Sequence, residues 1–260
     1  MIISRIIPVK SAVYKTISKR AEKLDGFVQW KPYHWFAVWV LMSSGTSAQQ
    51  GILNRYSYWS MSQAGIGLTT LLIVTLIIAL LLKKELFSFS NIDLRPAHLF
   101  SHFIFAFVLF LTGWGWINGD YFTAMKSFLP YVLAYGSVLL MYRLNVDEIP
   151  EKGYQPGKVY IAFCLLLALA SSALGVIFDD PVISAASMVY VPFLVVAIVF
   201  PEHKRHIQRI RIYPIFIYAM FVSVRVPWLL IPLAILFFSL RTYNYFRYNI
   251  VYPTFSVDHD

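Results

Sequence analysis

The feature that most constrains this chain is a series of uncharged apolar runs, each about as long as a lipid bilayer is thick. Residues 64–82, 99–117, 159–178 and 182–200 contain no Asp, Glu, Lys or Arg. A hydrocarbon core about 30 Å thick needs roughly 20 helical residues, so each run predicts a transmembrane helix. A shorter fifth run, 127–142, is extended by Tyr121 and Phe122 past Lys126, whose long stem can reach the headgroups.

Two further regions are predicted to cross the membrane less simply. Residues 33–53 begin with an aromatic cluster and turn polar in their second half, which favours a span that partly faces protein. Residues 212–240 are apolar but are broken by Arg225 and three prolines into pieces of 13 and 15 residues. These pieces are interpreted as two short, tilted crossings or one re-entrant hairpin.

The predicted fold is therefore an all-α, polytopic integral membrane helical bundle of about eight transmembrane segments. We expect one transmembrane domain over 1–260. Composition supports this class, because 58% of the residues are hydrophobic and only 13% are charged, whereas soluble domains are about 25% charged. A soluble globule, a disordered tail and a disulfide scaffold are excluded. The one cysteine, Cys164, is expected to be a small buried or lipid-facing residue.

The distribution of basic residues predicts the orientation. If the spans alternate from a cytoplasmic N-terminus, the inner segments hold 19 of the 22 Lys and Arg residues, and the outer loops keep only Arg55, Lys126 and Arg225. Because basic residues in short loops stay in the cytoplasm, we expect a multi-pass inner-membrane protein with both termini inside. The basic surface then faces the anionic lipid bilayer, which argues against nucleic acid as a partner.

The N-terminal segment, 1–31, is predicted to be a cytoplasmic amphipathic helix lying in the membrane interface. Its apolar residues recur at helical spacing with lysines between them; these are Val9, Val13, Tyr14, Ile17, Ala21 and Leu24. The alternative interpretation is a helix that docks on a partner protein.

The cytoplasmic loop 143–158, RLNVDEIPEKGYQPGK, is the first candidate site. Asp147, Glu148 and Glu151 fall within five residues, and Arg143 and Lys152 lie beside them. Such carboxylates can bind Mg²⁺, and neighbouring bases can take the charge of a phosphate. A solvated loop of mixed charge is the alternative, since its prolines and glycines explain the turns without a ligand.

The order of features around this loop, an apolar helix ending in YRLNVDE, then PEKGYQPGKV and a new apolar helix, resembles the first cytoplasmic loop of bacterial UbiA-type membrane prenyltransferases. The resemblance covers twenty to thirty residues and implies isoprenyl transfer, with Asp147 as a metal-binding catalytic carboxylate and Glu148 as its helper. The chain departs from the family pattern, because the family's further motif aspartates are missing and the segment 201–211 contains Glu202 alone.

Two other groups of residues are candidates for binding. The basic run HKRHIQRIR, 203–211, places Arg205 and Arg209 where they could bind a phosphate-bearing headgroup, although a run that only fixes topology needs no ligand. The pairs His98 with His102 and His203 with His206 have spacings that suit a metal, or they are simply amphipathic residues at a wet boundary.

The leading functional hypothesis is the handling of a lipid-linked, phosphate-bearing substrate, such as an isoprenyl diphosphate, at the cytoplasmic leaflet. Asp147, Glu148 and Glu151 would hold Mg²⁺, and Arg143, Lys152, Arg205 and Arg209 would bind phosphate. The alternative is a non-catalytic membrane subunit or assembly factor with membrane-protein partners. An uncoupled transporter is a third hypothesis, because no Asp or Glu falls within a predicted span and coupled transporters normally keep one there.

Overall fold

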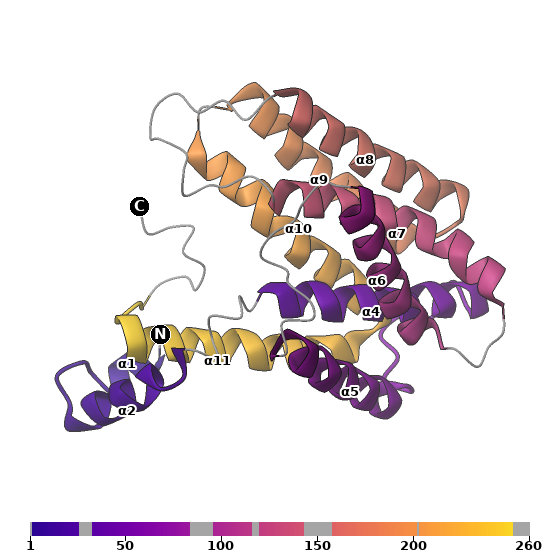
Figure 1. Cartoon of the computed structure of the whole chain (residues 1–260). Helices are drawn as coiled ribbons and strands as arrows, with labels where there is room; N and C mark the ends of the chain where they lie inside the picture. Colours follow the sequence, from indigo (N-terminus) through magenta and orange to yellow (C-terminus); the bar gives the residue numbers. More distant parts are fainter. Residues whose placement is uncertain are drawn as a thin grey trace. The chain divides into compact units, whose positions relative to one another are not determined.

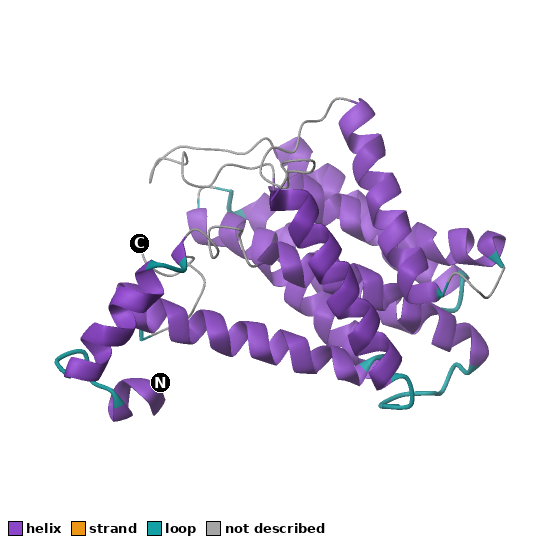
Figure 2. Cartoon of the chain, turned by 60° about the horizontal axis from the view of Figure 1, so that its bottom comes forward, coloured by secondary structure: helices purple, strands orange, loops and turns teal. Residues whose placement is uncertain are grey.

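The computed structural model describes residues 2–25, 33–83, 96–115, 120–142, 158–201 and 203–251. Within these ranges the chain consists of helices and loops, with no β-strand (Figures 1 and 2). The described part holds ten α-helices and one 3₁₀ turn: α1 (Ile2–Ile6), α2 (Ala12–Glu22), α4 (Tyr33–Leu53), α5 (Ala64–Lys83), α6 (Pro96–Trp114), α7 (Tyr121–Tyr142), α8 (Lys158–Ile177), α9 (Pro181–Val199), α10 (Lys204–Arg225), η2 (Pro227–Leu229) and α11 (Leu230–Tyr248). The all-α prediction is confirmed for these residues.

The chain divides into two compact units. The terminal unit comprises 1–36 and 230–260, and the central unit comprises 37–229. Helices α1, α2 and α11 belong to the terminal unit, and α5 to α10 with η2 belong to the central unit. A single transmembrane domain over the whole chain stays a prediction.

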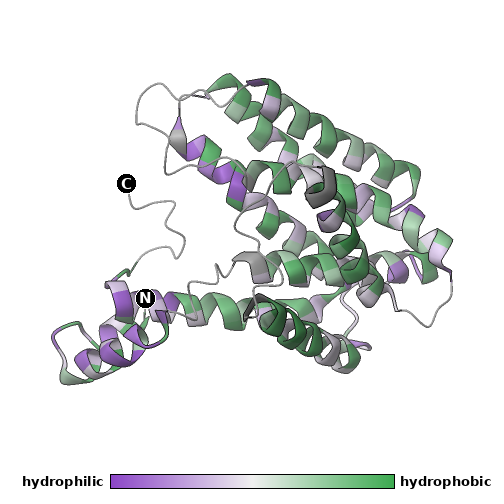
Figure 3. Ribbon diagram, in the orientation of Figure 1, coloured by the Kyte–Doolittle hydropathy of each residue, from purple (hydrophilic) through white to green (hydrophobic). Residues whose placement is uncertain are grey.

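Six of the described helices are long and apolar enough to cross a membrane. The qualifying segments are Ala64–Leu81, Tyr121–Met141, Lys158–Ile177, Pro181–Val199, Arg205–Arg225 and Pro227–Tyr248, and Leu99–Trp114 is a shorter apolar helix. Figure 3 shows that α5, α8 and α9 are hydrophobic along most of their length. The protein is therefore a multi-pass membrane protein whose helices contact lipid. Helix α4 has the predicted bounds, 33–53, but its polar second half keeps it outside this set.

The predicted break of 212–240 at Arg225 is confirmed, but the expectation that the two pieces are short was wrong. Helices α10 and α11 contain 22 and 19 residues, which corresponds to about 33 and 28 Å. Helix α10 begins inside the basic run, which is hydrophilic in Figure 3, and α11 continues into the C-terminal tyrosines. Both helices are long enough for a full crossing.

Pro214 and Pro227 have different effects on α10: the helix continues past Pro214 and ends just before Pro227. Pro214 lies inside α10 and provides no N–H for the carbonyl of Ile210. The Tyr190 hydroxyl of α9 donates to that carbonyl at 2.8 Å, so the helix continues. The break comes at Val226, which has ψ 64°, because a residue that precedes a proline, here Pro227, is disfavoured in the α-region.

Small residues allow the helices of the central unit to approach closely. A side chain at Gly113 of α6 would overlap the carbonyl of Met42 in α4. The Thr46 hydroxyl donates to the carbonyl of Gly113 at 2.8 Å. Between α8 and α9, a Cβ at Gly175 would lie 2.8 Å from the backbone nitrogen of Ser184. Backbones that pack this closely are typical of helices in lipid.

An apolar core lies between α7, α8, α9 and α10. Its fully buried members are Met141, Ile161, Cys164, Ala168, Tyr190, Leu194, Ala197, Ile207 and Ile210. The interpretation of Cys164 as a small buried residue is confirmed. This core fixes α10 against α9, and α10 carries basic residues at both of its ends.

In the terminal unit, α2 packs against the C-terminal part of α11. Ser11 caps α2 by accepting a hydrogen bond from the backbone nitrogen of Tyr14 at 3.1 Å. The Tyr14 hydroxyl then donates to the carbonyl of Tyr245 at 3.0 Å, and the Tyr245 hydroxyl donates to the carbonyl of Ile7 at 2.6 Å. Helix α2 was predicted to be amphipathic, and its buried face is covered by α11 of the same chain. Val13 and Leu24 remain exposed, and the membrane-interface position stays a prediction.

Asp25 holds the same two segments together by charge. Its carboxylate lies 2.9 Å from Arg247 Nη2, and it also accepts a hydrogen bond from the Tyr243 hydroxyl at 2.5 Å. The hydrogen bonds from Arg247 and Tyr243 hold the pKa of Asp25 below its ordinary value.

Candidate functional site

The predicted Mg²⁺ loop lies almost entirely outside the described residues. Positions 143–157, which include Arg143, Asp147, Glu148, Glu151 and Lys152, are not described. Their roles in metal and phosphate binding stay predictions. The loop leads directly into α8, which begins at Lys158.

Arg205 and Arg209 both lie on the exposed face of α10, one helical turn apart. The opposite face of the same segment carries Ile207 and Ile210, which are fully buried in the core. Among the described residues, no acidic side chain pairs with either arginine. The guanidinium groups of Arg205 and Arg209 are therefore exposed next to each other on the surface of the helix bundle.

The histidines do not assemble a metal site in the part of the chain that the structure describes. His203 and His206 stack edge to face, with ring centres 5.4 Å apart, and both lie beside Phe200. His102 is buried in α6. Across the described ranges, no three His, Cys, Asp or Glu side chains are grouped to hold a metal. The pair 203 and 206 forms an aromatic cluster with Phe200 at a helix end.

Charged residues meet at the other end of α10, around the loop between α8 and α9. Arg55 pairs with Asp179 at 2.8 Å, and Arg225 pairs with Asp180 at 3.3 Å. The ammonium group of Lys126 lies 5.1 Å from the ring centre of Phe178. Arg55, Lys126 and Arg225, the three bases that the sequence-based prediction assigns to the outer side, therefore all contact this one loop.

Arg225 is the most deeply buried charged side chain described, with 1% of its side chain exposed. Its Nη1 donates to the carbonyl of Ser47 at 3.3 Å as well as to Asp180. Gly51 makes room for it, because a Cβ there would overlap the guanidinium. The Tyr58 ring covers it, with its centre 5.6 Å from Cζ. The guanidinium is thus enclosed between α4, the loop after α4 and the end of α10.

Asp180 joins three helices through its two carboxylate oxygens. Oδ1 caps the start of α9 by accepting from the backbone nitrogen of Val182 at 3.1 Å. Oδ2 accepts from the Tyr131 hydroxyl of α7 at 2.7 Å. With the Arg225 pair, this makes Asp180 the junction of α7, α9 and α10. Only 13% of its side chain is exposed.

Several buried polar atoms in this region have no partner among the described residues. Nε and Nη2 of Arg225, which form one edge of the guanidinium, donate to no acceptor among the described residues. Trp228 Nε1, three residues later, is likewise unpaired, and Gln50 Oε1 is the one amide oxygen in this state. Buried donors normally have acceptors. The Nε and Nη2 donors of Arg225 therefore need a hydrogen-bond acceptor from outside the described residues.

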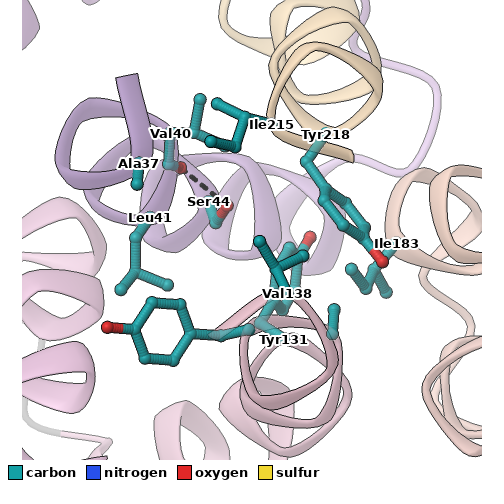
Figure 4. A pocket seen from close by; sticks show the side chains of 11 residues that line it. Ala37, Val40, Leu41, Ser44, Tyr131, Val138, Ile183, Ile215 and Tyr218 are labelled. Atoms are coloured by element: carbon teal, nitrogen blue, oxygen red, sulfur yellow. Dashed lines mark hydrogen bonds between the residues drawn. The ribbon is translucent and has the colours of Figure 1, made fainter. Parts of the chain in front are cut away.

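A cavity lies between α4, α7, α9 and α10 (Figure 4). It has a volume of about 50 Å³. Aliphatic side chains line most of it, and Ser44, Tyr131, Tyr135 and Tyr218 are its polar members. In Figure 4, the Tyr218 side chain extends from α10 with its hydroxyl towards Ile183. A cavity with this lining favours an apolar ligand.

The cavity and the arginine lie along the same helix faces. On α10, the lining residues Ile215 and Tyr218 continue at helical spacing to Arg225. On α4, Ser44 lines the cavity, and Ser47, one turn further along, accepts from Arg225. Tyr131 belongs to both, since it lines the cavity and donates to Asp180. Tyr131 therefore links the wall of the cavity to the buried ion pair.

Sequence reasoning placed Arg225 at a helix end, which is confirmed, but it did not find the partners of this arginine. The pair with Asp180 joins positions that are 45 apart in the chain, so no local pattern reveals it. One signal was present: Asp180 followed by Pro181 is a typical helix start. A helix start places its carboxylate at the same end of the bundle as Arg225.

No family model, curated protein or solved structure matches this chain.

Proposed function

We propose that this protein handles a lipid-linked, phosphate-bearing substrate at the cytoplasmic leaflet of the inner membrane. In this proposal α4 to α11 make eight crossings, which puts both termini on one side of the membrane, and the basic residues make that side the cytoplasm. Isoprenyl diphosphates, with a phosphate head and an apolar tail, are the substrate class that this arrangement fits. The proposal treats the end of the bundle where α8 and α10 begin as the cytoplasmic end.

The observation that carries the proposal is the exposed pair Arg205 and Arg209. Two guanidiniums one turn apart, without acidic partners among the described residues, form a surface for an oxyanion. Arginine forms bidentate hydrogen bonds to phosphate, and a lipid diphosphate offers two phosphate groups. The rest of this helix face is apolar enough to lie in the membrane.

The antiparallel order of α8, α9 and α10 supports a joint site with the loop 143–157. Helices α8 and α9 pack against each other, and so do α9 and α10. The starts of α8 and α10 therefore lie at the same end of the bundle (Figure 1). In this proposal Asp147, Glu148 and Glu151 hold Mg²⁺ near that end, and Arg143 and Lys152 add positive charge for phosphate.

The test is the binding of geranylgeranyl diphosphate to the purified full chain, compared with the uncharged geranylgeraniol. We expect the double variant Arg205→Gln/Arg209→Gln to weaken binding of the diphosphate by about 10-fold or more, because each lost charged hydrogen bond is worth about 1.5–3 kcal/mol. Binding of the alcohol should not change. A matched control is Lys15→Gln/Lys19→Gln, which removes the same charge at the same spacing from α2.

The metal part of the proposal has its own measurement. Asp147→Asn/Glu148→Gln should abolish the dependence of diphosphate binding on Mg²⁺ while the protein still accumulates in the membrane. Equal binding of the diphosphate and the alcohol by the unaltered chain would contradict the phosphate site. Metal-independent binding would contradict only the Mg²⁺ site.

A second candidate function, a non-catalytic membrane subunit, is favoured by the exposure of α5. Only 11% of its membrane-length window is buried, the lowest share among the six candidate spans. A row of large aliphatic side chains is exposed along it: Leu72, Ile73, Leu76, Ile77 and Leu80. An apolar transmembrane helix of a partner would cover this face. Sizing after gentle detergent extraction separates the two functions, since a subunit migrates with its partner.

A further inference from the structure

We propose that a groove between α2 and α11 binds one anionic phospholipid, with the lipid phosphate on Arg20 and an acyl chain along the apolar part of the groove. The groove belongs to the terminal unit alone. It is a different site from the phosphate-binding pair Arg205 and Arg209, which lies on α10 in the central unit. The inference therefore goes beyond the proposed function.

The groove is large enough for a ligand and is built from one face of each helix. Its volume is about 470 Å³, within the range of about 300–1,000 Å³ that is usual for small-molecule sites. The hydrogen bond from Tyr14 to Tyr245 and the ion pair of Asp25 with Arg247 join its two walls. The lining residues recur at helical spacing; they are Ile17, Arg20, Ala21 and Leu24 of α2 and Phe238, Ser239, Thr242, Tyr243 and Phe246 of α11.

The apolar lining residues favour a hydrocarbon chain over a free phosphate or a sugar. Ala21 and Phe246 are buried at the junction of the two helices. Leu24 and Phe238 line the same groove and are exposed. A hydrocarbon chain that covers these exposed side chains removes their apolar surface from water, which is favourable. The ligand therefore has an apolar part.

The position of the groove along α11 favours a lipid of the membrane. Helix α11 belongs to a candidate span, Pro227–Tyr248, and the end of this helix carries three tyrosines and Arg247. Such residues are typical of the membrane interface. The lining residue Phe238 lies ten positions before Tyr248, which corresponds to about 15 Å along the helix axis. The groove therefore extends from the interface to the depth of the acyl chains.

Arg20 is the group that binds the lipid phosphate. Its side chain is exposed and lines the groove. Among the described residues it has no acidic partner. The two neighbouring acids, Glu22 and Asp25, both contact Arg247. A guanidinium forms paired hydrogen bonds to phosphate oxygens, so the phosphate of a lipid headgroup provides the acceptor that Arg20 lacks.

The charge of α2 favours an anionic lipid over a zwitterionic one. Lys19 and Lys23 lie close to Arg20 on the same helix, and both are exposed. They attract a headgroup with a net negative charge. They also repel the ammonium group of phosphatidylcholine or phosphatidylethanolamine. Phosphatidylglycerol, which has a phosphate and no ammonium group, has the required chemistry.

The test measures lipid binding to the delipidated full chain in detergent by native mass spectrometry. The three probes are dioleoylphosphatidylglycerol, dioleoylphosphatidylcholine and glycerophosphoglycerol, which is the first headgroup without acyl chains. We expect one phosphatidylglycerol to bind about 10-fold more tightly than phosphatidylcholine, because the basic residues of α2 act on its net charge. Glycerophosphoglycerol should bind about 100-fold more weakly than phosphatidylglycerol, because it leaves the apolar side chains uncovered.

Two variants change the two parts of the groove separately. Arg20→Gln removes the phosphate contact, so phosphatidylglycerol binding should weaken about 10-fold. Ser239→Phe fills part of the groove and keeps Arg20, so binding of both phospholipids should fall.

Two controls keep these positions apart from the rest of the chain. Lys15→Gln is the matched control for Arg20→Gln, because it removes one exposed charge from α2 outside the groove. It should change binding by less than about 2-fold. Arg205→Gln/Arg209→Gln should leave phosphatidylglycerol binding unchanged, so a failure of this site and a failure of the proposed function are distinguishable.

Four results would overturn the proposal. Equal binding of the two phospholipids would mean that the groove does not select charge. Equal binding of glycerophosphoglycerol and phosphatidylglycerol would mean a phosphate site without a chain. Equal losses for Arg20→Gln and Lys15→Gln would mean unspecific attraction of lipid to a basic helix. Unchanged binding in Ser239→Phe would place the acyl chain elsewhere. Arg20 and Ser239 are both exposed, so neither substitution removes a buried contact.

Discussion

Arg225 Nη1 lies 3.3 Å from Asp180 Oδ1, which joins the last residue of α10 to the residue that caps the start of α9. The side chains are 1% and 13% exposed. Because both charges are largely removed from water, each depends on the other for compensation. This pair is therefore expected to respond to mutation very differently from an ion pair at the surface.

Replacing Asp180 with asparagine should destabilise the protein strongly. Asp180→Asn keeps one oxygen that can still cap α9, but an amide NH₂ replaces the oxygen that accepts from Tyr131, and the guanidinium of Arg225 is left buried without a counter-charge. We expect the free energy of unfolding in mixed micelles to fall by about 3 kcal/mol or more.

The neighbouring aspartate provides the control for this prediction. Asp179 pairs with Arg55, and their side chains are 61% and 49% exposed. Exposed pairs contribute about 0–1 kcal/mol, so Asp179→Asn should change stability by less than about 1 kcal/mol. Equal losses for the two variants would show that burial of the Arg225 pair has no energetic consequence.

Two glycines test the enclosure of Arg225. Gly51→Ala places a Cβ 2.7 Å from Cζ of Arg225, which must displace the guanidinium from Asp180. We expect a loss of about 2 kcal/mol or more. Gly65 has no neighbouring atom within 4 Å of its Cβ position, so Gly65→Ala should be neutral or stabilise α5 by up to about 1 kcal/mol. Thermal unfolding of both variants in the same detergent checks the difference, and a mild effect at Gly51 would contradict the enclosure.

The spans were the part of the fold that the sequence predicted well, for a physical reason. Long uncharged runs such as 159–178 and 182–200 reappear as α8 and α9 within one residue at each end, because in lipid an apolar helix is the structure that satisfies its own backbone. The region 212–240 was misread. Its helices extend into charged and aromatic flanks, and the loss of a donor at Pro214 is offset by Tyr190 from another helix.

The polar site could not be predicted in the same way. The contacts of Arg225 come from Ser47, Asp180 and Tyr58, which lie in three separate segments. Sequence periodicity reports which face of a helix is apolar, but it does not report which helices meet. The role of Gly51 could not be predicted from the sequence either, because the guanidinium of Arg225 occupies the space that a side chain at position 51 would fill.

The contact between Asp25 and Arg247 predicts how the terminal unit responds to acid. Arg247 and Tyr243 lower the pKa of Asp25 in the folded chain. The stabilisation is therefore fully present above the unfolded pKa of about 4 and is lost as the pH falls through the lower folded value. We expect amide hydrogen exchange in α2 to stay slow from pH 7 to about pH 4 and to accelerate below it relative to its intrinsic rate. Asp25→Asn should remove this pH dependence, and an unchanged profile would contradict the role of the pair.

The most direct test of the whole account is to find which side of the membrane each end of the bundle faces. In a Cys164→Ala background, single cysteines are placed at Arg55 and at Arg205 and labelled with a membrane-impermeant maleimide. The account predicts that the Arg55→Cys chain is labelled in intact cells and that the Arg205→Cys chain is labelled only after the membrane is opened. Labelling of both positions from the same side would contradict the account.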